Sequence, residues 1–143
     1  AMRPERFVTQ KIISAAGRIA AGRRETLTLG NRNIRRDWGW APEYVDAMWR
    51  MLQQDRPDDY VIATGETNSL TDFIAAAFEA VGLDWKDHVR QDPSLLRPSD
   101  IESIRANPAK ATERLGWRII EWAIVVLIWG ILPSWISSFK KSK

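Results

Sequence analysis

A pair of arginines in a short loop is the feature of this chain best suited to bind a ligand. Arg35 and Arg36 follow a β-prone stretch, Thr26 to Leu29, and a Gly30-Asn31 turn, so we expect them at the end of a sheet. Ligands of open α/β sheets bind at such an edge. The guanidinium group is planar, always charged and donates two parallel hydrogen bonds, which suits a phosphate. The loop therefore predicts an anion site; the alternative is that Arg36 pairs with an acid such as Asp37.

Two further cations are candidates for that site. Lys11 falls on an expected helix, and Arg97 lies in a proline-containing segment. For Lys11 the alternative is a solvated charge, and for Arg97 it is a pair with an acid. Residues 1–36 carry nine Lys or Arg and two acids, whereas residues 37–113 carry seven and fifteen. A basic segment beside an acidic one indicates an anionic ligand at a local site and argues against nucleic acid along a whole face.

Residue types that many enzymes use are scarce. The 143 residues include no cysteine and one histidine, His88, which excludes a disulfide framework and metal sites built from thiolates or several imidazoles. Motifs typical of dinucleotide, phosphate-loop and hydrolase sites, such as Gly-x-Gly-x-x-Gly, are missing. His88 lies in an expected irregular segment and is interpreted as a solvated surface residue. We therefore assign no catalytic residue and no metal ligand.

Hydrophobic spacing predicts the elements that position these residues. We expect a helix up to Gly22, a strand over Thr26–Leu29, a basic loop over Arg32–Arg36, a helix from Pro42, a strand over Tyr60–Ala63, a helix over Leu70–Val81, irregular chain over residues 84–106 and a helix over Pro108–Leu115. Helices alternating with strands predict an α/β fold.

Two helices carry more detailed signals. Ser69 and Asp72 form a weak capping box at the start of the Leu70–Val81 helix. The helix from Pro42 gathers apolar residues on one face, where Trp49 is interpreted as core; these residues are Tyr44, Val45, Met48, Trp49 and Leu52.

The end of the chain has a different composition. Trp122 to Phe139 is a run of eighteen residues without a charge, and Lys140, Lys141 and Lys143 follow it. This length is the lower bound for a membrane-spanning helix, and the lysines would keep that end on the cytoplasmic side. Pro133 and three serines inside the run count against a span.

Eight short motifs now point to one family. They are Phe7-Val8-Thr9-Gln10-Lys11-Ile12, Leu29-Gly30-Asn31, Arg36-Asp37-Trp38-Gly39, Met48–Gln54, Asp59–Glu66, Val81–Trp85, Leu96-Arg97-Pro98 and Leu115-Gly116-Trp117. Over about residues 3–117, in unbroken order, the chain resembles the C-terminal part of the GDP-mannose 4,6-dehydratase family, which are extended short-chain dehydrogenase/reductases. The Asp-Trp-Gly and Ala-Thr-Gly-Glu pieces together make the resemblance specific.

The resemblance implies a fold and a division of the chain. The expected fold is α/β, the C-terminal substrate-binding part of a Rossmann-type enzyme that lacks most of the parallel sheet. Residues 1–117 would be the nucleotide-sugar-binding portion. Residues 118–143 would be an apolar, helical tail with a basic end, unrelated to the family.

The resemblance also implies a chemistry and a set of site residues. Such enzymes convert GDP-mannose to GDP-4-keto-6-deoxymannose with NADP. By the family's motifs, the substrate contacts are Val8, Lys11, Arg36, Arg97 and Asp100, and the NADP contact is Arg3. Arg36 would grip the diphosphate, and Arg97 with Asp100 would hold the ribose and phosphates. The family has Glu at the position of Asp100, so the ribose contact is the less secure of these assignments.

The same resemblance implies what this chain lacks. The family's glycine-rich NADP loop and its Tyr-x-x-x-Lys pair are not among these 143 residues. We therefore expect a cytoplasmic chain, inactive alone, that works with a missing N-terminal half or in a homo-oligomer and binds no nucleic acid. The alternative is a membrane-anchored nucleotide-sugar-binding or scaffold protein without catalysis, held by residues 122–139.

Overall fold

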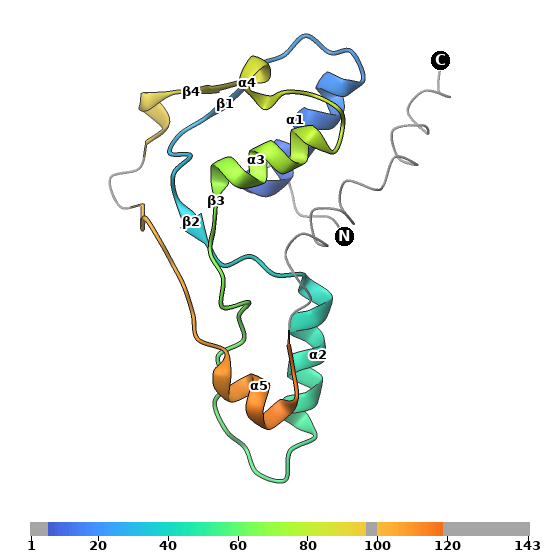
Figure 1. Cartoon of the computed structure of the whole chain (residues 1–143), viewed down its shortest axis with the longest axis vertical. Coiled ribbons are helices and arrows are strands. Elements are labelled where there is room, and N and C mark those ends of the chain that lie inside the picture. Colours follow the sequence, from blue (N-terminus) through green and yellow to red (C-terminus); the bar gives the residue numbers. More distant parts are fainter. Residues whose placement is uncertain (1–5, 97–99, 119–143) are drawn as a thin grey trace.

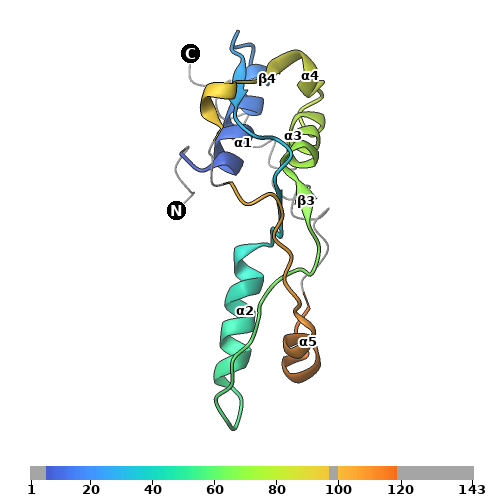
Figure 2. The ribbon, with the colours of Figure 1, turned by 90° about the vertical axis from the view of Figure 1, so that its left-hand side faces the viewer.

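The computed structural model describes residues 6–96 and 100–118 and arranges them as two lobes joined by short strands (Figure 1). The upper lobe contains α1 (Val8–Ala20), β1 (Leu27–Leu29), α3 (Leu70–Glu79), α4 (Trp85–His88), β4 (Val89–Gln91) and the 3-10 turn η1 (Pro93–Leu95). The lower lobe contains α2 (Ala41–Leu52), the chain from 53 to 63, α5 (Ala109–Leu115) and Trp117. Between the lobes lie β2 (Arg35–Arg36), β3 (Asn68–Ser69) and residues 101–104, together called the central strands. Figure 2, turned by 90°, shows the same elongated shape.

The upper lobe has a continuous hydrophobic core. Apolar residues of α1 recur at the spacing of one helical face and pack against α3 and the parallel pair β1–β4, in which Leu27 is opposite Val89. The buried residues of this core are Ile12, Ala15, Ala16, Ile19, Leu27, Leu29, Leu70, Ile74, Phe78 and Val89. The predicted strand and the two predicted helices therefore form this core together with β4, which the sequence did not predict.

The start of α3 confirms the predicted capping box. The Ser69 hydroxyl accepts from the Asp72 amide at 3.0 Å, and the Asp72 carboxylate accepts from the Ser69 amide at 2.9 Å. Both bonds satisfy amides that a helix start leaves without a partner. The Ser69 hydroxyl, which also donates to the Asp72 carboxylate at 2.7 Å, and then the Ser69 amide hold the pKa of the Asp72 carboxyl below its ordinary value.

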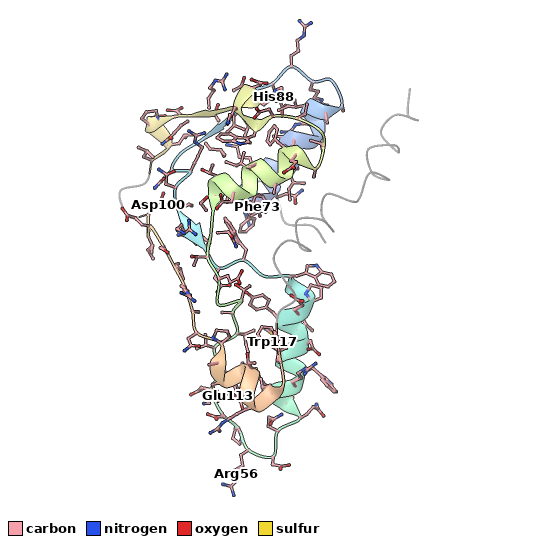
Figure 3. All side chains as sticks on the ribbon, in the orientation of Figure 1. Arg56, Phe73, His88, Asp100, Glu113 and Trp117 are labelled. Carbon is pink, nitrogen blue, oxygen red and sulfur yellow. The ribbon has the colours of Figure 1, made fainter. Side chains whose placement is uncertain are left out.

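The lower lobe is held by a smaller cluster. Ala47 of α2 packs against Ala111 and Leu115 of α5 and against Trp117, all buried. α5 ends as predicted at Gly116, whose φ of 58° lies in the left-handed region that glycine adopts without strain. The Trp117 indole then donates to the Glu43 carbonyl at 2.9 Å. Figure 3 shows Trp117 beside α2.

The central strands connect segments that are distant in the sequence. β2 pairs antiparallel with β3, so that Arg36 is opposite Asn68. On its other side, the Arg35 amide donates to the Glu102 carbonyl at 2.7 Å, and the Ile104 amide donates to the Arg35 carbonyl at 3.2 Å. β2 is thus the middle strand of this small layer.

Three secondary-structure expectations are wrong. Tyr60–Ala63 is not a strand, because no strand within residues 6–96 and 100–118 pairs with it; Tyr60 and Ile62 instead pack on the lower-lobe cluster. Residues 84–106 are not irregular, since they contain α4, β4 and η1. The Arg32–Arg36 loop ends in a strand, β2, which pairs with chain more than 30 residues away.

Two burial expectations are also wrong. Trp49 is 60% exposed and is not core, because α5 and residues 60–63 cover the opposite side of α2. His88 is half-buried, not solvated, since its ring stacks on Phe78 with centroids 6.0 Å apart.

Candidate anion-binding site

Arg36 is held in place by two backbone carbonyls. Its Nη1 donates to the carbonyl of Arg35 at 2.8 Å and to that of Ile101 at 2.6 Å. Both Nη1 protons are therefore used. The Nε–Nη2 edge, which is the edge that binds a phosphate through two parallel bonds, makes no hydrogen bond to residues 6–96 or 100–118. Carbonyls orient the guanidinium without cancelling its charge.

The central strands bring Arg36 next to a second predicted site residue. Ile101, whose carbonyl Arg36 binds, directly follows Asp100, and Figure 3 shows Asp100 beside β2. The two residues are more than 60 positions apart in the sequence. The pairing of residues 102–104 with Arg35 produces this proximity, and Asp100 is half-buried there.

Asp37, the next residue after Arg36, connects the end of β2 to the loop around Thr64 and Gly65 through hydrogen bonds. Its carboxylate accepts from the Thr64 amide at 2.9 Å, the Thr64 hydroxyl at 2.7 Å and the Gly65 amide at 3.0 Å. Gly65 has a φ of 81°, in the left-handed region. Arg105 closes the same loop from the other side, donating from Nε to the Gly65 carbonyl at 2.8 Å.

These bonds decide between two interpretations of Arg36. If Arg36 were a structural ion pair, Asp37 would be its partner, yet the Asp37 carboxylate is occupied by Thr64 and Gly65. Within the described ranges, no carboxylate lies within ion-pair distance of Arg36. The charge of Arg36 therefore has no acidic partner among residues 6–96 and 100–118.

Val8 and Lys11 lie apart from this cluster, on α1 in the upper lobe. Val8 is half-buried and packs against the upper core. The Lys11 ammonium donates to the Thr28 carbonyl of β1 at 2.8 Å, so it is not simply a solvated charge. Lys11 also lines a shallow cavity of about 360 Å³ between α1 and β1, near the Arg18–Glu25 ion pair. Among the described residues, the hydrogen bonds of Lys11 and Arg36 share no partner.

The sequence analysis placed Arg35 and Arg32 in the basic loop but did not predict their contacts. Arg35 donates from Nη2 to the Thr67 carbonyl at 2.7 Å. Arg32 lies over the Trp85 ring at 5.4 Å, and its buried Nε has no hydrogen-bond partner among the described residues. Only tertiary structure brings Trp85 to Arg32, so the basic loop itself carried no signal for this contact.

The side chains of the described residues are better suited to binding an anion than to acting as catalytic groups. Tyr44 is near Asp37, and burial, with the charges of Asp37 and Glu43, raises the pKa of its hydroxyl above the ordinary 10.0. Tyr44 therefore stays protonated at neutral pH and is no general base. Residues 6–96 and 100–118 contain no cluster of His, Asp or Glu able to hold a metal ion. The arrangement can bind and orient an anion.

Several predictions fall where the structure gives no description. Arg3 and Arg97 lie outside the described residues, so their roles stay predictions. The membrane-anchored alternative gains no support: none of the helices that the structure describes is long and apolar enough to cross a bilayer, and Trp122–Phe139 lies beyond them.

Sequence comparisons give one consistent result. A family model described as GDP-mannose 4,6 dehydratase matches residues 1–121. GDP-mannose 4,6 dehydratase 1 of Arabidopsis thaliana is 49% identical over 116 residues, which are 81% of this chain and 32% of the relative. The GDP-mannose 4,6-dehydratase of Sinorhizobium fredii is 43% identical, with 82% of this chain and 38% of the relative covered. The chain thus spans about a third of the length of these relatives.

Comparison with solved structures gives the fold. RMD from Pseudomonas aeruginosa, complexed with NADPH, aligns with a TM-score of 0.79 at 19% identity, over 95% of this chain and 44% of that one. The dTDP-glucose 4,6-dehydratase of Bacillus anthracis, in complex with NAD, aligns with a TM-score of 0.74 at 12% identity, over 99% and 41%. The chain therefore has the α/β fold of part of a nucleotide-sugar dehydratase or epimerase.

Proposed function

The chain belongs to the GDP-mannose 4,6-dehydratase family, and on that premise we propose that it is the nucleotide-sugar-binding part of such an enzyme. Its ligand would be GDP-mannose, bound for conversion to GDP-4-keto-6-deoxymannose. It would act in the cytoplasm, with a missing N-terminal half that carries the dinucleotide loop or in a homo-oligomer.

The observation that carries the proposal is the state of Arg36. Two carbonyls fix its Nη1, while its charge has no acidic partner within the described ranges. A fixed guanidinium with an available Nε–Nη2 edge binds a phosphate with less loss of side-chain entropy than a mobile one. The diphosphate of GDP-mannose fits this requirement.

The remaining contacts are proposed from the family's motifs. Asp100, next to the carbonyl that holds Arg36, would accept a ribose hydroxyl. Arg97 would share the phosphates, and Val8 and Lys11 would line the guanosine-diphosphate site. For Lys11 this requires the ammonium to serve both the ligand and the Thr28 carbonyl, which its three donors allow.

Hydride transfer would need a nicotinamide cofactor, for which the family resemblance implies NADP. The chain contains no glycine-rich dinucleotide loop, and Arg3, its proposed NADP contact, lies outside the described residues. We assign no step of the reaction to this chain, whose role is to bind and orient the substrate. Sustained turnover of GDP-mannose with NADP by the purified chain alone would contradict this assignment.

Calorimetry with GDP tests the binding proposal. Arg36→Ala should weaken GDP binding about tenfold to a hundredfold, because hydrogen bonds to charged groups contribute roughly 1.5–3 kcal/mol. Arg36→Lys should retain part of the affinity, since lysine keeps the charge but loses the bidentate edge.

Arg35→Ala is the matched control. It removes the same charge from the neighbouring position of β2, whose side chain donates to the Thr67 carbonyl instead. Successive side chains of a strand point to opposite faces, so its GDP affinity should stay near that of the unsubstituted chain. Equal losses in Arg35→Ala and Arg36→Ala would mean a diffuse charge effect and would remove Arg36 from the site.

A further inference from the structure

Two segments of the chain contact each other at both of their ends, and a glycine lies at one of these contacts. The first segment runs from Gly30 to Arg36 and the second from Leu95 to Ile101, so the two have equal length. At one end, Arg36 donates to the Ile101 carbonyl at 2.6 Å. At the other end, Gly30 lies against the backbone of Leu95. This second contact sets where the chain that leads to Ile101 begins.

The contact between Gly30 and Leu95 leaves no space for a side chain. A Cβ atom on Gly30 would lie 2.5 Å from the Leu95 carbonyl oxygen and 3.0 Å from its carbonyl carbon. Both atoms belong to the backbone, so rotation of a side chain does not relieve the overlap. Gly30 is not one of the glycines with a positive φ. Glycine is therefore required here for the close approach of two backbones and not for a special backbone conformation.

The two sides of this contact are held unequally. The chain after Gly30 is fixed on α3, because the Arg32 carbonyl accepts from both the amide and the hydroxyl of Thr71 at 3.1 Å. On the other side, η1 lies at the surface, and Leu95 is 46% exposed. A methyl group added to Gly30 would therefore displace η1 and not the basic loop.

η1 is well enough fixed to transmit this constraint along the chain. The Asp92 carboxylate accepts from the Ser94 amide at 2.8 Å and from the Ser94 hydroxyl at 2.7 Å. The Asp92 amide in turn donates to the Leu29 carbonyl at 2.9 Å. The chain around η1 is therefore attached to the end of β1 at Asp92 and again, through Gly30, at Leu95.

We propose that Gly30 is a positioning residue for the anion-binding site. Its lack of a side chain lets η1 lie against the end of β1, and this placement of η1 determines where the Ile101 carbonyl meets Arg36. Asp100, next to that carbonyl, is placed by the same connection. Gly30 acts through η1 and needs no contact with the ligand. The part of this inference that concerns GDP rests on the proposed function, whereas the part that concerns the strand beside β2 does not.

Amide hydrogen exchange of the full chain without ligand tests the geometric part. Two hydrogen bonds join β2 to the strand beside it: the Arg35 amide donates to the Glu102 carbonyl, and the Ile104 amide donates to the Arg35 carbonyl. In Gly30→Ala, both amides should exchange about tenfold faster, because a methyl group forced into a filled space displaces the backbone around it. The Thr71 amide, on the side that stays fixed, should keep its rate.

Gly17→Ala is the matched control. It adds the same methyl group within α1, and apart from the backbone of its own helix no described atom lies within 4 Å of the added carbon. Its Arg35 and Ile104 amides should exchange as in the unsubstituted chain. Unchanged exchange of these amides in Gly30→Ala overturns the proposal. Equal acceleration of the α1 amides also overturns it, since that result means general destabilisation of the upper lobe.

Calorimetry with GDP tests the consequence for binding. Gly30→Ala should weaken GDP binding about tenfold. In a chain that already carries Arg36→Ala, the same substitution should cause little further loss, because the displaced carbonyl then has no guanidinium to orient. An equal loss in both chains would be an effect unrelated to Arg36 and overturns the proposal.

The two measurements separate this inference from the proposed function. If the unsubstituted chain binds no GDP, the proposed function fails, and exchange of the Arg35 and Ile104 amides still decides whether Gly30 places the strand beside β2. If the unsubstituted chain and Gly30→Ala bind GDP equally, the proposed function stands and the positioning role of Gly30 is refuted.

A second pair of variants covers the case in which Gly30→Ala does not fold. Asp92→Ala removes the carboxylate that caps η1. Asp84→Ala removes the matching cap of α4, where the Asp84 carboxylate accepts from the Lys86 amide at 2.9 Å. Only Asp92→Ala should accelerate exchange of the two amides between β2 and the strand beside it. Equal rates in the two variants would overturn the proposal.

Discussion

The two lobes use helices of similar pattern with different results. In the upper lobe, α1 lies between α3 and the β1–β4 pair, and its apolar face is buried. In the lower lobe, α2 has an equally regular apolar stripe, but only Ala47 is fully buried, and Val45, Met48, Trp49 and Leu52 are each more than half exposed. The pattern is a property of the helix, whereas burial is a property of what lies against it. The upper lobe has its own core, and the lower lobe needs a partner layer.

The central strands connect these unequal lobes and also hold the candidate site. Arg36 depends on the Ile101 carbonyl, and Asp37 depends on Thr64 and Gly65. The site therefore lies at the junction between the lobes. If the lobes unfold separately, the site should lose its geometry when either one opens.

The largest expected effect tests whether the upper-lobe core carries most of the stability. Phe78→Ala, at a fully buried position, should cost about 3–5 kcal/mol of unfolding free energy. Trp49→Ala, at a position of α2 that is 60% exposed, should change the unfolding free energy by less than about 0.5 kcal/mol. Urea unfolding of both variants measures the contrast. A large loss in Trp49→Ala would mean that a covering layer contributes as much as the upper core.

A smaller effect should be confined to the lower lobe. Trp117→Phe removes the indole hydrogen bond to the Glu43 carbonyl and should cost about 1–2 kcal/mol, since a typical hydrogen bond contributes roughly 1 kcal/mol and the ring is also smaller. Amide hydrogen exchange should accelerate in α2 and α5 while α1 and α3 keep their protection. Equal acceleration in both lobes would contradict separate units.

The smallest effect is a pH dependence at the start of α3. The pKa of the Asp72 carboxyl is lowered, first by the Ser69 hydroxyl. The ionised Asp72 carboxylate therefore stabilises the folded state fully at pH values above 3.8, the ordinary pKa of an aspartate. This stabilisation is lost as the pH falls through the lowered pKa.

Ser69→Ala should cost about 1 kcal/mol near neutral pH and weaken the acid response of α3. Exchange of the α3 amides at about pH 5 and about pH 2.5 tests this. The lower lobe serves as the internal control, because Lys110 still lowers the pKa of Asp58 there. If acid accelerates exchange of the α3 amides equally in Ser69→Ala and in the unsubstituted chain, the Asp72 carboxyl is not the cause of that acceleration.

Local chemistry let the sequence predict several features correctly. The Ser69–Asp72 capping box and the α5 stop at Gly116 require only residues near one another in the chain. The apolar periods of α1, α2 and α3 are equally local. The basic loop left open whether Arg36 pairs with Asp37 or binds an anion; the structure gives Arg36 no acidic partner among the residues that it describes, and the anion site stays a prediction.

Tertiary structure decided the rest. Tyr60–Ala63 has the composition of a strand, but a strand requires a hydrogen-bonding neighbour, and none pairs with it in the described chain. Arg35 and Arg36 became a strand because β3 and residues 102–104 lie on either side. Trp49 is apolar in sequence and exposed in space because its side of α2 faces away from α5. Which face is covered and which carbonyl holds Arg36 depend on contacts across 30 to 65 residues, which local spacing does not encode.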